Sequence, residues 1–203
     1  MLALAVSFLV SDPNGWTLVS SEEAYVAGVD TKVKRTGGSS GFLRSSDSTA
    51  EGWAQLLQVI RGSNYKGKRV RLRAYLKTDT VVGRAGLFMR VEGENPQQPL
   101  AWDNMQDRPI KGTTTWQRVA VVLDVPSDSK RMLFGLLLTG RGKVWIDDVS
   151  LEVVDETVPV TDVMHRWPHP ERPENLDFER AGPVLDPSPP DDAIPLVVIP
   201  QRS

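Results

Sequence analysis

The stretch that most constrains the fold runs from Trp116 to Val154, WQRVAVVLDVPSDSKRMLFGLLLTGRGKVWIDDVSLEVV. Val, Leu, Ile and Phe dominate three short runs in it. Pro126 closes the first run, and Gly140 and Gly142 close the second. Short apolar runs between turn-forming residues are typical of β-strands. We therefore expect three consecutive antiparallel strands, at 116–125, 131–139 and 143–154.

The segment 68–78, KRVRLRAYLKT, shows the clearest alternation of apolar and polar residues in the chain. The apolar series is Val70, Leu72, Ala74 and Leu76, and the polar series is Arg69, Arg71, Arg73, Tyr75 and Lys77. Residues 85–92 repeat the pattern, with Leu87, Met89 and Val91 opposite Phe88, Arg90 and Glu92. Because successive strand side chains point to opposite faces, this pattern predicts a sheet with one buried and one solvated face.

Other short runs predict further strands, and the residues between them favour turns. The additional strands are expected at 2–10, 16–20, 25–29, 41–45, 53–61 and about 100–104. The rest of 93–115 is rich in Pro and Gly and predicts loop. No window of 11 or more residues holds a helical period. Many short strands separated by turns indicate an all-β sandwich or barrel, and we favour the sandwich.

The composition changes after Val154. Ten of the 15 prolines of the chain lie between Pro159 and Pro200. Proline donates no amide to a sheet and favours extended, solvated backbone. We expect residues 1–155 to form the sandwich module and 156–203 a proline-rich linker or tail, draped over the module or free, with 196–199 as a candidate edge strand.

Composition excludes several classes of function. The formal net charge of −2 argues against nucleic-acid binding by this chain alone, which needs a basic excess. The absence of cysteine excludes thiolate chemistry and disulfides. The two histidines, His165 and His169, both lie in the tail, so the module has no Ser-His-Asp triad and no His-rich metal centre.

No segment predicts a membrane span. No run approaches the roughly 20 apolar residues that a transmembrane helix requires. The start, MLALAVSFLV, lacks the basic residues and the cleavage site of a signal peptide, so we interpret it as an opening strand, with a signal-peptide remnant as the alternative. The compartment, secreted or cytoplasmic, stays open.

Three motifs resemble the galactose-binding-domain-like jelly rolls of carbohydrate-binding modules. They are the closing strand VWIDDVSLEVV, the segment GGSSGFL at 37–43, and YKGKRVRLRAYLKT at 65–78. Residues 25–155 are more narrowly similar to a bacterial accessory module with the pattern DNM-DRPI-GTT-W, here Asp103 to Trp116, that is attached to transcription regulators and secreted hydrolases. The resemblance implies a jelly-roll β-sandwich of two antiparallel sheets.

Two features depart from the resembled pattern. The opening Asn-x-x-Phe-Glu of such modules is absent from the start of the chain. The sequence NLDFE occurs instead at 175–179, in the proline-rich tail. It marks either the start of a truncated second module or a chance match, and both interpretations stay open.

Mixed aromatic and polar residues on the strands suggest a ligand site. Sugars are bound by aromatic planes that cover their C–H faces and by polar groups that bond their hydroxyls. The candidate ligand-binding residues are Gln58, Tyr75, Phe88, Arg90, Trp102, Asp103, Asn104 and Trp145. The alternative is that Trp102 and Trp145 are core or loop-anchoring residues and that Arg71 and Arg73 form a solvated face. We expect Trp16, Trp53 and Trp116 to be core residues.

Asp147 and Asp148 on the closing strand carry the metal hypothesis. The resemblance implies that one of them ligates a structural calcium ion, which needs six to eight oxygen ligands. The opening Glu that would supply another ligand is missing. The favoured alternative is that both carboxylates accept hydrogen bonds from loop amides and pin the last strand.

No catalytic constellation stands out. The carboxylate pairs Glu92 with Glu94 and Asp103 with Asp107 are candidates for an acid and a base, but nothing in the pattern sets their spacing or separates their pKa values. We therefore predict a non-catalytic ligand-recognition module for carbohydrate or a carbohydrate-like small polar molecule, in fused or tandem context. The alternative is a sensory or interaction domain of a bacterial transcription regulator whose DNA-binding part lies outside this chain.

Overall fold

The computed structural model describes residues 13–162 and Leu176, and these residues form an all-β fold. Apart from the short 3-10 helix η1 (Gly62–Asn64), every regular element in them is a strand. The strands are β1 (Thr17–Ser20), β2 (Tyr25–Asp30), β3 (Ser40–Ser45), β4 (Trp53–Arg61), β5 (Lys68–Glu92), β6 (Pro99–Asp103), β7 (Ile110–Val125), β8 (Arg131–Thr139) and β9 (Lys143–Val154). Within this part of the chain, no helix is long and apolar enough to cross a bilayer.

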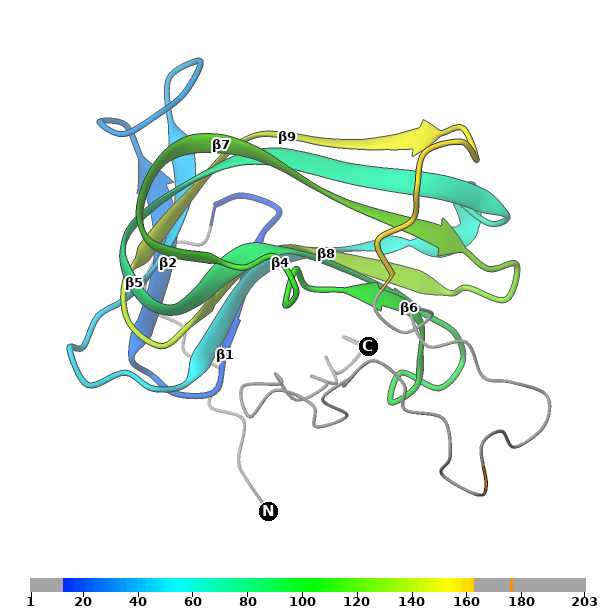
Figure 1. Ribbon diagram of the computed structural model, residues 1–203, viewed down its shortest axis with the longest axis horizontal. Coiled ribbons are helices and arrows are strands. Elements are labelled where there is room, and N and C mark those ends of the chain that lie inside the picture. The colour runs from blue at the N-terminus through cyan, green and yellow to red at the C-terminus, as the bar shows by residue number, and fades with distance from the viewer. Residues whose placement is uncertain (1–12, 163–175, 177–203) are drawn as a thin grey trace.

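The strand β5 joins the two layers of the sandwich (Figure 1). Its first part pairs with β7 on one side and β9 on the other, and its second part pairs with β8 and β6. One layer is therefore β2-β3-β9-β5-β7, named here the β9 sheet, and the other is β1-β4-β8-β5-β6, named the β8 sheet. The expected jelly-roll sandwich of antiparallel strands is confirmed.

Two expectations about β5 and β7 were wrong. The predicted strands 68–78 and 85–92 are one continuous strand, because the intervening residues bend from one sheet into the other. Gly83 permits this bend, since a Cβ atom there would lie 2.3 Å from the carbonyl oxygen of Thr139. β7 begins at Ile110, so residues 110–115, predicted as loop, follow β5 through the bend.

The three C-terminal strands are consecutive in sequence but are not neighbours in a sheet. β7, β8 and β9 each pair with β5, and none pairs with another of the three. Their expected bounds are confirmed for β8 and β9. Strand composition locates a strand but does not choose its partner, which here lies far away in the sequence.

The core lies between the two sheets, and the predicted alternation along the first part of β5 is confirmed. Val70, Leu72, Ala74 and Leu76 are fully buried, whereas the arginines between them are half-exposed. On the outer side, Arg71 lies 3.0 Å from a carboxylate oxygen of Glu152 on β9. The outer face of the β9 sheet is therefore the solvated, charged face that the pattern predicts.

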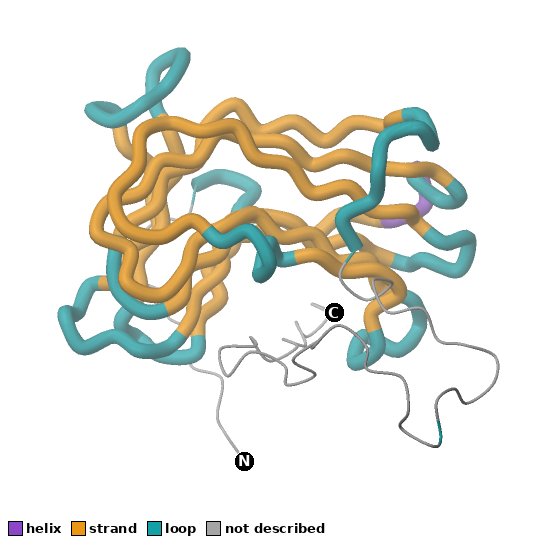
Figure 2. Tube along the Cα trace, viewed as in Figure 1, coloured by secondary structure: helices purple, strands orange, loops and turns teal. Residues whose placement is uncertain are grey.

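The chain after β9 closes the edge of the sandwich between β7 and β6 (Figure 2). Arg69 donates to the carbonyl oxygens of Glu156 and Val158. The amide of Thr161 then donates to the carbonyl of Val122, and its hydroxyl accepts from the Val122 amide. The amide of Trp102 on β6 donates to Asp162 at 3.3 Å, so this segment links the edges of β7 and β6, which belong to opposite layers.

Several expectations concern residues that the structure does not describe. They are the strand at 2–10, the candidate strand at 196–199, His165, His169, and the 175–179 motif apart from Leu176. Residues 155–162 pack against the sandwich, and the division of the chain at 155 stays a prediction.

Candidate functional site

The outer face of the β8 sheet carries an unexpected apolar cluster. Leu57, Phe88, Leu133 and Leu137 form it, and Val19 and Trp53 pack against them; we name it the outer-face cluster. Sheet register explains its composition, because Leu57 is opposite Gly135 and Gly135 is opposite Phe88. All four central side chains are buried, although they point away from the core between the sheets.

The next row of the same face carries the polar groups. Val59 is opposite Leu133, Leu133 is opposite Arg90, and Arg90 is opposite Trp102 at the end of the row. The predicted alternation of 87–92 is therefore correct, but the expected solvation of its polar side is not. Phe88, Arg90 and Glu92 are all buried.

Glu92 is held between two arginines at the margin of this face. Its two carboxylate oxygens face the Nε atoms of Arg90, at 2.9 Å, and of Arg131. Arg90 also donates to the carbonyl oxygen of Pro96. Burial lowers the pKa of Arg90, and the nearby Glu92 opposes that shift. Two guanidinium groups thus face the single carboxylate of Glu92, and a second buried carboxylate, that of Asp162, accepts from the Trp102 amide at 3.3 Å.

Asn104, directly after β6, offers a hydrogen-bond donor. Its side-chain oxygen accepts from the Gln106 amide at 3.2 Å, and its carbonyl accepts from Arg84 at 3.2 Å. Its amide nitrogen Nδ2 is buried and has no acceptor among the described residues. A buried donor without a protein acceptor is available to a water molecule or a ligand.

The structure brings together only part of the predicted ligand set. Phe88, Arg90 and Trp102 share the outer face of the β8 sheet, and Asn104 follows β6 at its edge. Gln58 lies on the opposite side of β4 from Leu57, and Asp103 points to the opposite side of β6 from Trp102.

Tyr75 and Trp145 lie on the other outer face, that of the β9 sheet. The eight candidate residues therefore do not form a single site. The physical reason is the bend in β5, which carries Tyr75 and Phe88 of one strand to opposite sides of the sandwich.

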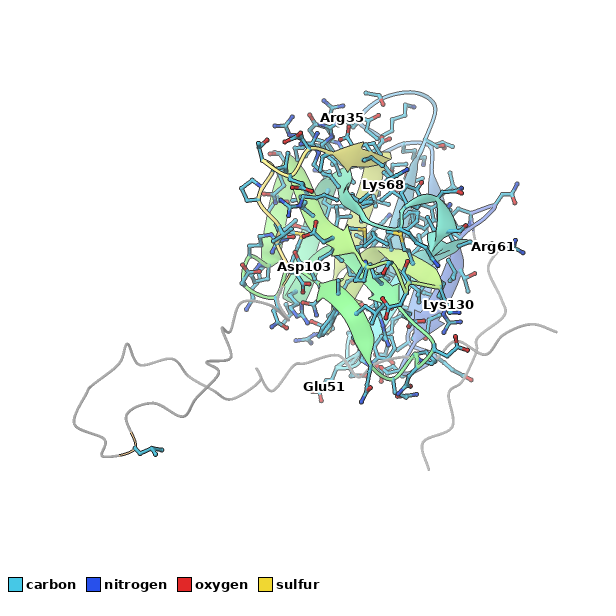
Figure 3. All side chains as sticks on the ribbon, turned by 90° about the vertical axis from the view of Figure 1, so that its right-hand side faces the viewer. Arg35, Glu51, Arg61, Lys68, Asp103 and Lys130 are labelled. Atoms are coloured by element: carbon cyan, nitrogen blue, oxygen red, sulfur yellow. The ribbon has the colours of Figure 1, made fainter. Side chains whose placement is uncertain are left out.

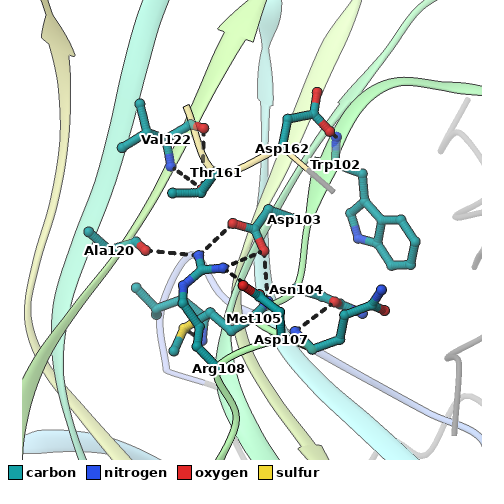
Figure 4. Close-up of polar contacts among 12 residues, drawn as sticks. Trp102, Asp103, Asn104, Met105, Asp107, Arg108, Ala120, Val122, Thr161 and Asp162 are labelled. Atoms are coloured by element: carbon teal, nitrogen blue, oxygen red, sulfur yellow. Dashed lines mark hydrogen bonds and ion pairs between the residues drawn. The ribbon is translucent and has the colours of Figure 1, made fainter. Parts of the chain in front are cut away.

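Asp103 is a structural anchor (Figure 4). Its buried carboxylate accepts from the amide of Met105 at 2.8 Å and from the guanidinium of Arg108. Arg108 in turn donates to the carbonyl of Ala120 on β7 at 3.1 Å. This chain of contacts ties the loop after β6 to β7.

Tyr75 and Trp145 are engaged by protein cations. The guanidinium of Arg35 lies 3.5 Å from the centroid of the Tyr75 ring. The ammonium of Lys143 lies 4.3 Å from the Trp145 ring, and the indole N–H of Trp145 donates to Asp30 at 2.9 Å. Both aromatic rings thus already have a partner, which suits a structural role on this face.

Asp147 and Asp148 hold the loop between β2 and β3. Asp147 accepts from the backbone amides of Arg35, Thr36 and Asp148, and Asp148 pairs with the side chains of Arg35 and Thr36. The Thr36 hydroxyl, and after it the Arg35 guanidinium, hold the pKa of Asp148 below its usual value. Figure 3 shows Arg35 on the opposite side of the sandwich from Glu51.

The metal hypothesis is a poor fit to this arrangement. All four carboxylate oxygens of Asp147 and Asp148 already accept protein hydrogen bonds. Among residues 13–162, no three His, Cys, Asp or Glu side chains come together as a metal site would require. The arrangement matches the loop-pinning alternative, and structural calcium stays a prediction.

The tryptophans expected in the core divide into three environments. Trp16 packs against the core, edge to face with Phe134 at 6.3 Å between ring centroids. Trp53 packs instead against the outer-face cluster, and Trp116 is half-buried in neither cluster. The sequence contained the information needed to place Trp53 beside Leu57, because Trp53, Gln55 and Leu57 lie on one face of a strand.

Comparison with known proteins defines the fold. No family profile matches the chain. Among solved structures, the enzymatically active domain of tailspike protein 4 from bacteriophage CBA120 superposes with a TM-score of 0.54 at 18% identity, covering 70% of this chain and 20% of the phage chain. The CBM22-1 xylan-binding domain from Paenibacillus barcinonensis Xyn10C gives a TM-score of 0.50 at 16% identity, covering 69% and 86%. These likenesses show the jelly-roll fold, which this chain shares with both structures.

Two further proteins are similar to this chain. A family 16 carbohydrate-binding module superposes with a TM-score of 0.50 at 12% identity, covering 72% of this chain and 99% of that module. In sequence, the chain is 39% identical over 175 residues to a Bacillus subtilis protein named uncharacterized HTH-type transcriptional regulator YbfP. That match covers 85% of this chain and 59% of the regulator, so the chain spans about three fifths of its curated relative.

Proposed function

We propose that this chain is a non-catalytic ligand-recognition module that binds carbohydrate on the outer face of the β8 sheet. The proposal rests on one arrangement. Half-exposed Trp102 lies opposite buried Arg90, and Arg90 lies opposite Leu133 of the outer-face cluster. An aromatic plane beside buried hydrogen-bonding groups is the combination that sugar recognition needs.

The binding mode follows from these positions. The indole of Trp102 would cover the C–H face of a sugar ring, and Trp53 would extend the apolar surface toward β1. The side chain of Asn104, whose Nδ2 has no acceptor among the described residues, would donate to a sugar hydroxyl. Arg90 would place its charge beside the same hydroxyls, or beside a carboxylate substituent.

The carboxylates near this face support a binding role over a catalytic one. Glu92 is buried and neutralised by two arginines, whereas Glu94 is largely exposed and pairs with Lys130. Asp103 is tied to Arg108. Neither of the considered pairs thus presents a free acid and a free base to one substrate, as glycoside hydrolysis requires.

The fold comparisons are consistent with the proposal. Carbohydrate-binding modules of families 22 and 16 share the jelly roll, and the first of them is named a xylan-binding domain. A shared fold by itself does not assign a ligand, so the proposal depends on the residues of the face.

A glycan array followed by calorimetry on the best ligands, beginning with xylo-oligosaccharides, tests the proposal. Trp102→Ala should weaken binding at least tenfold, because it removes the stacking plane. Trp116→Ala is the matched control, since that half-buried tryptophan lies outside the outer-face cluster. The proposal would be overturned if the unmodified chain bound no glycan on the array, or if both variants lost the same amount of affinity.

The similarity to a protein named as a transcription regulator favours a second role. In it, this chain is the sensory domain of a longer regulator whose DNA-binding part lies elsewhere, and sugar binding is the signal. The two roles differ in one measurement, the affinity of the full gene product for its promoter DNA with and without the sugar found on the array. A sugar-dependent change supports sensing, and no change supports attachment or targeting.

A further inference from the structure

We propose a second binding site, for an oxyanion, at the end of the sandwich where β5 crosses between the sheets. An open hollow of about 450 Å³ lies there. Its walls come from the end of β3 and the loop that follows, from the bend of β5, and from the turn between β8 and β9. It shares no residue with the outer-face cluster, so this proposal does not depend on sugar binding at Trp102.

The charge of the hollow is positive. Arg44, Arg141 and Lys143 line it, and Asp47 is the opposing carboxylate. Arg141 donates to the carbonyl of Ser48 at 2.7 Å and Arg44 to that of Ser45 at 3.1 Å. Both guanidinium groups are thus positioned by neutral backbone oxygens, those of Ser45 and Ser48.

The remaining charges do not cancel this excess. Lys143 pairs with Asp30 at 3.0 Å, and a carboxylate oxygen of Asp47 accepts from the amide and hydroxyl of Thr49. Of the residues that line the hollow, three are therefore cations and one, Asp47, is a carboxylate. An incoming anion would meet two guanidinium groups with unused N–H donors.

The backbone around the hollow is held in an unusual conformation. Thr80, on its wall, has a φ of 52°, which is strained for a β-branched residue. The amide of Thr80 donates to the Thr113 hydroxyl at 2.9 Å, which helps to keep this conformation. Strained backbone that neighbouring contacts maintain is concentrated at functional sites.

The two walls are also joined directly. The amide of Val82 donates to the carbonyl of Arg141 at 2.9 Å, and that of Ser45 donates to Gly142 at 2.9 Å. At Gly142 a Cβ atom would lie 2.6 Å from Cα of Val81, so only glycine permits this approach. The backbones that carry Arg44 and Arg141 are therefore set at one separation, which limits the entropy lost on binding.

The lining defines the ligand class. Guanidinium groups bind planar or tetrahedral oxyanions in pairs of hydrogen bonds, and the hydroxyls of Ser46, Ser48 and Thr80 add donors. Val82 is the one apolar side chain of appreciable size in the lining. The shared chemistry is a phosphate, a sulfate or the carboxylate of an acidic sugar.

Titrations of the intact chain at low ionic strength with sodium phosphate, sodium sulfate and galacturonate, followed by NMR or calorimetry, test the site. Galactose is the neutral control. The double substitution Arg44→Gln with Arg141→Gln should weaken anion binding at least tenfold and leave the melting temperature within a few degrees. Arg118→Gln, on the exposed outer side of β7, is the matched control and should change the affinity for the anion less than twofold.

The outcomes distinguish an acidic sugar from an inorganic anion as the ligand, and they distinguish failure of the anion site from failure of the sugar site. Tightest binding of galacturonate assigns the hollow to an acidic sugar, and tightest binding of an inorganic anion assigns it to free phosphate or sulfate. Trp102→Ala should leave anion binding unchanged, so loss of sugar stacking and loss of this site are distinguishable. Absence of saturable binding for all three anions, or equal weakening in Arg118→Gln, would overturn the site.

Discussion

The Nε atom of Arg90 lies 2.9 Å from Oε1 of Glu92, on an outward face of the sandwich where both side chains are nearly completely buried. The distance is that of an ion pair, although the N–H does not point at the oxygen well enough to make a hydrogen bond. Arg131 supplies the second cation for Glu92. A buried charge is stable only when it is paired, so the cluster of Arg90, Arg131 and Glu92 is sensitive to the loss of the Glu92 carboxylate.

Glu92→Ala should therefore lower the free energy of unfolding by about 3–5 kcal/mol, since it leaves two arginines without their carboxylate. Chemical denaturation measures the change. The control is Glu94→Ala, because Glu94 is largely exposed and pairs with exposed Lys130 at 3.0 Å. It should cost less than about 1 kcal/mol. Equal effects of the two substitutions would contradict the structure.

Asp30 should make the stability of the fold depend on acid pH. Its pKa is held well below its usual value, first by the indole N–H of Trp145 and then by the amide of Val33. A lowered folded-state pKa stabilises the fold above the unfolded-state pKa of about 3.9, and this contribution is lost as the pH falls through the folded value. Melting temperatures should therefore fall steeply below about pH 4.

Asp30→Asn tests this assignment. At pH 7 it should cost about 1–2 kcal/mol, because charge-assisted hydrogen bonds to Trp145 and Lys143 are lost. Its melting temperature should then fall less with acid than that of the unmodified chain. Asp128→Asn, at an exposed position, should leave the acid dependence unchanged. An unaltered acid profile in Asp30→Asn would refute the role given to this carboxylate.

Gly135 on β8 has no room for a side chain. A Cβ atom there would lie 2.1 Å from the carbonyl oxygen of Leu56 on β4. Gly135→Ala should therefore push β4 and β8 apart and destabilise the fold by about 1–3 kcal/mol. Gly38→Ala, where no atom lies within 4 Å, should change stability by less than about 0.5 kcal/mol. Thermal melts of the two variants compare them directly.

Asp103 and Arg108 should be energetically coupled. The pair ties the loop after β6 to β7, and the Asp103 side chain is fully buried. A double-mutant cycle with Asp103→Asn and Arg108→Gln should give a coupling energy of about 1–3 kcal/mol. The same cycle on Asp107 and Arg108, both of which are about one third exposed, should give less than about 0.5 kcal/mol. Coupling that is as small for Asp103 as for Asp107 would argue against the anchor.

Calcium at Asp147 and Asp148 is tested by melting in millimolar calcium and in a chelator. Because these carboxylates already accept hydrogen bonds from the β2–β3 loop, we expect the two melting temperatures to agree within about 1 °C. Asp147→Ala should lower the melting temperature in both conditions. A calcium-dependent rise of several degrees that Asp147→Ala abolishes would restore the metal hypothesis.

Much of the secondary structure was readable from the sequence, because side chains alternate along a strand with a period of two. The bounds of β4, β8 and β9 agree with the predicted segments, and the inward series along the first part of β5 is the predicted one. The candidate site was readable only in part. Phe88, Arg90 and Trp102 share a face as expected, whereas Tyr75 and Trp145 do not join them.

The amino-acid sequence by itself determined the fold class and most of the strand positions, and it excluded thiolate chemistry because the chain has no cysteine. Only the tertiary structure decided that β5 belongs to both sheets, and hence that Tyr75 and Phe88 face opposite sides. It also decided that the outward side of 84–92 is buried. The reason is physical: alternation is a property of neighbouring residues, whereas strand partners and burial depend on segments that lie far apart in the chain.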